Sequence, residues 1–133
     1  MTALHTWHSL VKDRDHTALN TLLAEDVVLL SPVVHTPIAG KKMVKLYLTA
    51  ALHTFANETF TYVRELADAN TAILEFTTTV DGILVNGVDM IRWNNAGQIT
   101  EFKVMVRPLK AVNIIHQKMG EMLDKLKESS RQL

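Results

Sequence analysis

Cysteine is absent from the 133 residues of this chain. Its absence excludes disulfide bonds, thiolate metal sites and a cysteine nucleophile, and it favours the cytoplasm as the compartment. An excess of charge is also lacking, because fourteen basic residues balance fourteen acidic ones. Nucleic acid is therefore not an expected partner, since its binding usually depends on a strongly positive surface.

Long hydrophobic runs are missing as well, and the apolar stretches are much shorter than a bilayer span. No membrane partner is expected, and the N-terminal residues show no signal-peptide pattern. Glycine and proline are scarce, at five and three residues, whereas hydrophobic residues make up 47% of the chain. We predict a single domain over residues 1–133, in which residues 109–133 form a C-terminal helical extension.

Motifs for phosphate loops, nucleophile elbows and metalloproteases are absent too. Six histidines invite a metal hypothesis, but His5 and His8 are only an i,i+3 pair near the N-terminus. A dedicated metal site needs ligands at fixed spacing, which these histidines do not provide. The sequence therefore predicts no metal and no cofactor.

The clearest positive pattern lies in residues 71–108, where apolar and polar residues alternate between two turn signals. Asp81 and Gly82 are typical of a tight turn, and residues 94–97 tolerate positive φ. We predict a three-strand antiparallel meander with one face in the core. The side chains expected on that inner face are Ala72, Leu74, Phe76, Val80, Phe102, Val104 and Val106.

Helical spacing of apolar residues predicts helices over residues 3–13, after the capping residue Asp15, over residues 41–55 and after Pro108. The second of these is expected to place Leu19, Leu22 and Leu23 on its apolar face. Strands are expected at residues 27–31 and 59–66. Between the first strand and the third helix, an irregular loop holds His35 and is expected to lie beside a pocket.

Asp89 is the most informative polar residue, because it shares a strand face with Ile91 and Trp93, opposite Arg92. Only one of these two charged residues can point inward. A carboxyl can be buried as the neutral acid, whereas a guanidinium cannot be neutralised. We therefore predict that Asp89 faces the core; the alternative is a bulged strand that turns it toward water.

The pattern resembles the nuclear transport factor 2-like (NTF2-like) superfamily, and in particular its ketosteroid isomerase and SnoaL-like polyketide cyclase branches. Residues 22–27, residues 31–40 and the segment 88–99 around Asp89 carry the resemblance, which extends over about residues 3–108. It implies an α+β fold shaped like a cone. In this fold a curved antiparallel sheet packs against N-terminal helices, and the C-terminal helix follows it.

The resemblance also assigns roles. Asp89 matches the isomerase aspartic acid that stays protonated and donates to the oxyanion. The position of the catalytic base holds Ser31, and the register puts Trp7 where the isomerase has its tyrosine. A serine hydroxyl is no base near neutral pH without a partner, so catalysis of the isomerase type is not expected.

Three functions remain open, because one fold hosts many activities. The first is binding of a small hydrophobic molecule in an apolar pocket. The second is an isomerase, cyclase or hydrolase with Asp89 and His35 as an acid–base pair. The third is a non-catalytic structural or interaction module, and a homodimer through the sheet is expected in any case. The predicted pocket residues are Trp7, Leu30, Ser31, His35, Tyr47, Asp89, Ile91, Trp93, Phe102, Val104 and Val106.

Overall fold

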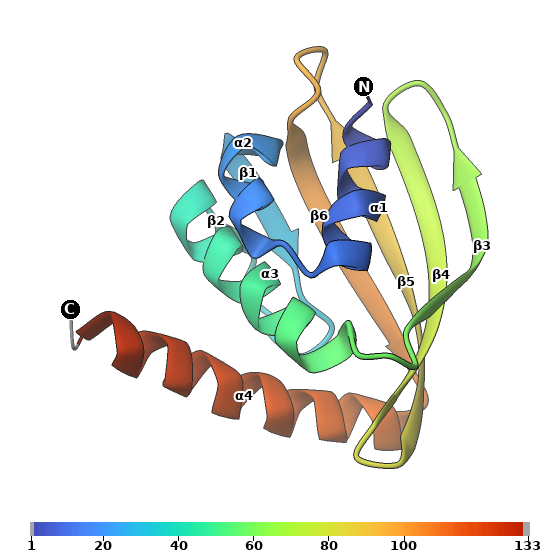
Figure 1. Cartoon of the computed structure of the whole chain (residues 1–133), viewed down its shortest axis with the longest axis vertical. Coiled ribbons are helices and arrows are strands. Elements are labelled where there is room, and N and C mark those ends of the chain that lie inside the picture. The colour runs from blue at the N-terminus through green and yellow to red at the C-terminus, as the bar shows by residue number, and fades with distance from the viewer. Residues whose placement is uncertain (1, 132–133) are drawn as a thin grey trace.

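The computed structural model describes the backbone of residues 2–131 and the side chains of residues 2–129. Within this range the chain folds into four α-helices, a short 3-10 turn and one six-stranded sheet (Figure 1). The elements in chain order are α1 (Ala3–Asp13), η1 (His16–Ala18), α2 (Leu19–Leu22), β1 (Leu23–Leu30), β2 (Ile38–Ala39), α3 (Lys41–Phe55), β3 (Thr61–Ala67), β4 (Thr71–Val80), β5 (Ile83–Trp93), β6 (Ile99–Arg107) and α4 (Leu109–Arg131).

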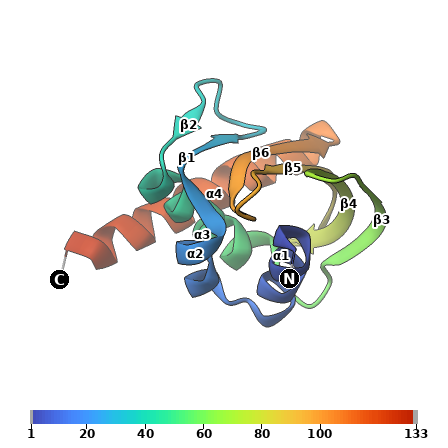
Figure 2. The ribbon, with the colours of Figure 1, turned by 90° about the horizontal axis from the view of Figure 1, so that it is seen from above.

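The sheet has the strand order β2-β1-β6-β5-β4-β3, and every neighbouring pair is antiparallel except β1 with β6. It is curved and open. The helices α1, α2 and α3 lie on its concave side, and α1 sits inside the curve formed by β3 to β6 (Figures 1 and 2). The predicted α+β fold with a curved sheet against N-terminal helices is confirmed.

The predicted meander is confirmed as β4, β5 and β6. Asp81 and Gly82 connect the first two strands with φ angles of 50° and 76°, the left-handed conformation expected of this turn. Burial alternates along β4, where Ala72, Leu74 and Phe76 are buried. The alternation therefore assigned the inner face correctly, because one face of this sheet packs on the core.

Two of the predicted helices have the expected bounds. The hydroxyl of Thr2 caps α1 by accepting from the backbone N–H of His5, and Arg14 ends the helix in the left-handed conformation. The buried face of α1 includes Trp7 and Leu10. The helix predicted over residues 41–55 is α3, whose buried face includes Leu48 and Leu52.

The region before α3 differs from the prediction in two ways. Leu23 begins β1 rather than ending the second helix, and it pairs with Ile99 of β6. The loop before α3 contains β2, whose Ile38 pairs with Leu29. A two-residue strand is too short to produce an alternating pattern, which explains why the sequence did not predict it.

The helix α4 packs against its own domain. Its buried residues Ala111 and Ile115 join Phe76, Val80 and Val85 in a core cluster at the end of the sheet. The helix also packs on α3, and Figure 1 shows it crossing below that helix. No helix in residues 2–131 is long and apolar enough to span a membrane.

Candidate functional site

A cavity of about 50 Å³ lies between α1, α3 and the concave face of the sheet. We call it the Asp89 cavity. Most of its wall is aliphatic or aromatic, and three residues bring polar atoms to it: Trp7, Tyr62 and Asp89. The remaining lining residues are Val11, Leu48, Ala51, Leu52, Phe55, Ala56, Phe60, Phe76, Phe102 and Val104.

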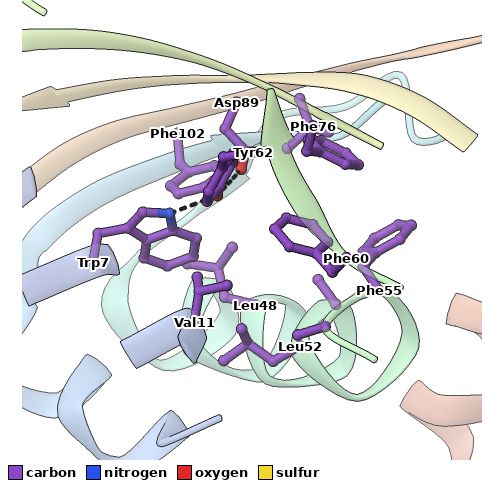
Figure 3. A pocket seen from close by; sticks show the side chains of 13 residues that line it. Trp7, Val11, Leu48, Leu52, Phe55, Phe60, Tyr62, Phe76, Asp89 and Phe102 are labelled. Atoms are coloured by element: carbon purple, nitrogen blue, oxygen red, sulfur yellow. Dashed lines mark hydrogen bonds between the residues drawn. The ribbon is translucent and has the colours of Figure 1, made fainter. Parts of the chain in front are cut away.

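Those three polar residues form one hydrogen-bonded chain, shown by the dashed lines in Figure 3. Nε1 of Trp7 donates to the phenol oxygen of Tyr62 at 2.9 Å. The phenol in turn donates to Oδ2 of Asp89 at 2.6 Å. The other carboxyl oxygen, Oδ1, has no side-chain partner among the described residues. One hydrogen-bonding position of Asp89 is therefore left for another molecule.

The orientation of Asp89 agrees with the prediction from strand alternation. Its side chain is only 6% exposed, and Ile91 and Trp93 on the same face are also buried. Arg92 points to the opposite face and is exposed. The strand keeps its regular pairing with β4 through this segment, so the alternative of a bulge at Asp89 is wrong.

Burial controls the ionisation of this pair. Loss of hydration raises the pKa of Asp89 from 3.8 to about 7, and the hydrogen bond from Tyr62 offsets part of that rise. Burial, reinforced by the neighbouring carboxylate, raises the pKa of Tyr62 well above 10.0. Near neutral pH the phenol therefore keeps its proton, and Asp89 is divided between the acid and the carboxylate.

Tyr62 is the residue that sequence reasoning missed. Simple alternation puts it on the same face as Arg64 and Leu66, which are exposed on the outer side of the sheet. The register between β3 and β4 shifts at this point, because Tyr62 pairs with Phe76 whereas Arg64 pairs with Glu75. This bulge turns the phenol inward. The hydrogen-bonding phenol beside Asp89 thus comes from β3.

Aromatic rings form the wall beyond Asp89. Phe60 stacks on Phe76 with ring centroids 5.1 Å apart, and Phe102 meets Trp7 edge-on at 4.8 Å. Phe76 lies over Gly87, where an added Cβ would come within 2.3 Å of the ring. The lack of a side chain at Gly87 therefore leaves the space that the ring of Phe76 occupies.

A surface groove of about 440 Å³ adjoins the Asp89 cavity and shares Val11, Ala56, Phe60 and Tyr62 with it. We call it the entrance groove. Its other residues are mostly polar and come from α1 and from the segment after α3. They are His8, Lys12, Arg14, Asn57 and Glu58.

A second hollow, of about 40 Å³, lies between β1, α3 and α4. We call it the Tyr47 hollow. It shares Leu48, Ala51, Phe55 and Val104 with the Asp89 cavity. Its remaining lining residues are Leu29, Ser31, Pro32, Val33, Tyr47, Ile115 and Met119.

The structure divides the predicted pocket residues among several places. Trp7, Asp89, Phe102 and Val104 line the Asp89 cavity, and Ser31 and Tyr47 line the Tyr47 hollow. The others line neither space. Ile91 and Trp93 are core residues, Val106 packs on the second core cluster, Leu30 is half-buried at the end of β1, and His35 is exposed in the following loop.

The lining residues of the Asp89 cavity can support hydrogen bonding and proton transfer. Ser31 is engaged locally, because its hydroxyl accepts from the backbone N–H of Val33 at 3.2 Å. Among residues 2–129, no three histidine, aspartate or glutamate side chains gather as metal ligands. The described residues therefore provide a donor, an acceptor and an ionisable carboxyl in apolar surroundings.

Comparison with solved structures reveals close relatives of the fold. A steroid delta-isomerase from Pseudomonas aeruginosa is 38% identical, with a TM-score of 0.88 over 95% of this chain and 92% of that one. A bacterial protein with a cystatin-like fold from Silicibacter pomeroyi is 29% identical, with a TM-score of 0.82 over 90% of this chain and 83% of its own. A putative ketosteroid isomerase from Kribbella flavida matches at 19% identity and a TM-score of 0.64, over 80% and 76% of the two chains.

No curated protein sequence matches the chain. The model of the SnoaL-like domain, however, matches residues 4–102, which include most of α1, the Trp7–Tyr62–Asp89 chain and most of the sheet. With its curved sheet, this chain therefore belongs to the SnoaL-like family of the NTF2-like superfamily.

Proposed function

We propose that this protein binds a small apolar molecule through one of the molecule's oxygen atoms, in the Asp89 cavity. The observation that carries the proposal is the unpartnered Oδ1 of Asp89 on a largely apolar wall. Ligand sites are mostly apolar and contain a few polar groups that orient the ligand. Here the orienting group is the carboxyl of Asp89, the last member of the hydrogen-bonded series that begins at Trp7.

The protons available in the hydrogen-bonded chain define which kind of ligand oxygen can be bound. Tyr62 has one proton, which it gives to Oδ2 of Asp89, and its oxygen already accepts from Trp7. Only Asp89 is then left to meet the ligand. Its neutral acid donates to a carbonyl or ether oxygen, whereas its carboxylate accepts from a hydroxyl. A ketone is thus favoured below a pH of about 7, where Asp89 holds its proton.

The size of the cavity limits the ligand. About 50 Å³ holds a few water molecules, so a molecule of several carbon atoms requires neighbouring side chains to move. The entrance groove offers a route, since it shares Phe60 and Tyr62 with the cavity.

Proton transfer is the second candidate, and two observations favour it. The pKa of Asp89 is about 7, the range in which a carboxyl works as a general acid or base. The relative from Pseudomonas aeruginosa is a steroid delta-isomerase. Against this candidate, the resemblance puts Ser31 where the isomerases have their catalytic base, and a serine hydroxyl is no base near neutral pH without a partner. Robust isomerisation of a β,γ-unsaturated steroid ketone by the native protein would favour catalysis over simple binding.

Acetophenone, an apolar ketone, is a suitable probe for the binding proposal. Calorimetric titration should show affinity that is constant below a pH of about 7 and falls by up to tenfold per pH unit above it. Asp89→Asn should remove this fall, because an amide donates at every pH. Asp13→Asn, at an exposed position on α1, is the matched control and should keep the native profile.

Native mass spectrometry adds a test without a chosen probe. A small molecule that is present in the native spectrum and lost on denaturation supports the proposal. Acetophenone binding that does not depend on pH, or no binding of the ketone together with no retained molecule, would contradict it. The latter result would favour the non-catalytic module.

A further inference from the structure

The Asp89 cavity and the Tyr47 hollow share part of their walls. Leu48, Ala51, Phe55 and Val104 line both spaces. Three of these residues belong to α3 at positions i, i+3 and i+7, so one stripe of this helix runs past both spaces. Ala51 lies in the middle of that stripe and has the smallest side chain of the four. Rotation of Leu48 or Phe55 therefore alters both spaces together.

Tyr47 is the aromatic residue of α3 that lines only the Tyr47 hollow. The phenol of Tyr47 makes no hydrogen bond with the described residues, and no side-chain polar atom in this part of the chain is both sealed from solvent and unpaired. The phenol oxygen is therefore accessible to solvent. The rest of the wall is mostly apolar and includes Ile115 and Met119 of α4.

From these observations we infer that the two spaces are chambers of one elongated ligand site, and that α4 closes its far end. This inference rests on the proposed function. The ligand class is an apolar molecule with an oxygen held at Asp89 and a tail that passes Leu48 and Phe55. The tail ends beside Tyr47 and Met119. The helix α4 thereby limits the length of the ligand.

Acetophenones with a 4-alkyl tail from ethyl to hexyl measure this length. In the native protein the affinity should rise by about fourfold per added methylene, the gain expected when apolar surface leaves water. In Met119→Trp, which fills the second chamber, the rise should stop at short tails while acetophenone itself binds within twofold of native. Gln117→Trp, at an exposed position of the same helix, is the control and should preserve the rise.

A second blocking variant, Val33→Phe, closes the chamber from the loop after β1 and should act like Met119→Trp. Should neither variant fold, Met119→Ala widens the chamber and should strengthen binding of the hexyl compound only. An equal gain per methylene in native and blocked proteins would overturn the inference, because the tail would then leave through the entrance groove. An unchanged hexyl affinity in Met119→Ala would overturn it as well. If acetophenone itself does not bind, the proposed function fails first, and the two failures are thereby distinguished.

Discussion

The phenol of Tyr62 lies 2.6 Å from Oδ2 of Asp89, although β4 separates the strands that carry the two residues. The hydrogen bond therefore crosses the concave face of β4 and fastens the edge strand β3 to the middle of the sheet. Trp7 adds α1 to the same network. A single buried chain of polar groups thus connects the first helix, the edge of the sheet and its centre.

Asp89→Asn should stabilise the protein near neutral pH. The pKa of Asp89 is raised on folding, so the unfolded chain loses its proton first as the pH rises above 3.8. The cost to stability grows until the folded protein also ionises, at about pH 7. The advantage of the variant should therefore be absent below pH 4, increase up to about pH 7, and reach at most roughly 4 kcal/mol.

Thermal unfolding of both proteins from pH 4 to pH 9 measures this difference, and NMR titration of the side-chain carboxyl gives the pKa directly. A titration midpoint at or below 3.8 would contradict the buried acid.

Tyr62→Phe should destabilise the protein and raise the pKa of Asp89 further. The substitution removes the acceptor of Trp7 and the donor to Asp89, which we expect to cost roughly 1–3 kcal/mol. It also removes the hydrogen bond that lowers the pKa of the carboxyl. Tyr47→Phe is the matched control, because its phenol has no hydrogen bond among the described residues. Equal losses in the two variants, measured by urea unfolding, would show that the polar chain contributes nothing to stability.

Gly87→Ala should be destabilising by roughly 1–3 kcal/mol, because the new Cβ forces Phe76 out of its position over β5. Gly120→Ala provides the contrast. It lies in α4 with no atom near the added methyl group, and alanine favours a helix by roughly 0.5–1 kcal/mol. Thermal unfolding should shift in opposite directions for the two variants. A shift of the same sign would show that the packing of Phe76 on Gly87 is not tight.

The outer face of the sheet should form a homodimer. It exposes Leu66, Ile73, Leu84 and Met105, which come from four neighbouring strands, among balanced charges. Met105→Asp should therefore shift the sedimentation coefficient at micromolar concentration toward that of a monomer. Leu109→Asp, at an exposed apolar position at the start of α4, should leave the dimer intact. A native protein that sediments only as a monomer would refute this assembly.

Deletion of residues 112–133 should lower the melting temperature, because it uncovers the core cluster at the end of the sheet. The point variant Ile115→Ala tests the same contact with less disruption and should cost roughly 2–5 kcal/mol. His116→Ala, at the neighbouring exposed position, should change stability by less than roughly 0.5 kcal/mol. A truncated protein with the native melting temperature would show that α4 is dispensable.

Most of the fold could be predicted because its strands alternate and its turns carry their own signals. The orientation of Asp89 followed from Ile91 and Trp93, because these apolar residues lie on the same strand face and were expected to be buried. Alternation indicates the face of a side chain, but not which inward residues reach an open space. Ile91 and Trp93 therefore proved to be core residues, and the stripe of Leu48, Ala51 and Phe55 on α3 was not recognised as wall.

The acceptor for Trp7 could not be predicted, because it depends on one irregularity. A bulge beside Val63 breaks the alternation that would otherwise direct Tyr62 outward. The only available hint was that this strand alternated less regularly than the meander. Phe76, the partner of Tyr62 on β4, was assigned to the inner face. It would have shown that Tyr62 also points inward, once the register between the two strands was known.

The bulge gives the register of β3 against β4 a chemical meaning. If Val63 paired regularly instead of being bulged out, it would lie opposite Phe76, and Tyr62 would lie opposite Thr77 with its phenol on the outer face. Every residue of the hydrogen-bonded chain would still be in the sequence. Two relatives could thus carry identical tryptophan, tyrosine and aspartate residues and still differ in whether the three meet. Within this family, a one-residue shift in the register of an edge strand can decide the presence of the site as effectively as the loss of Asp89.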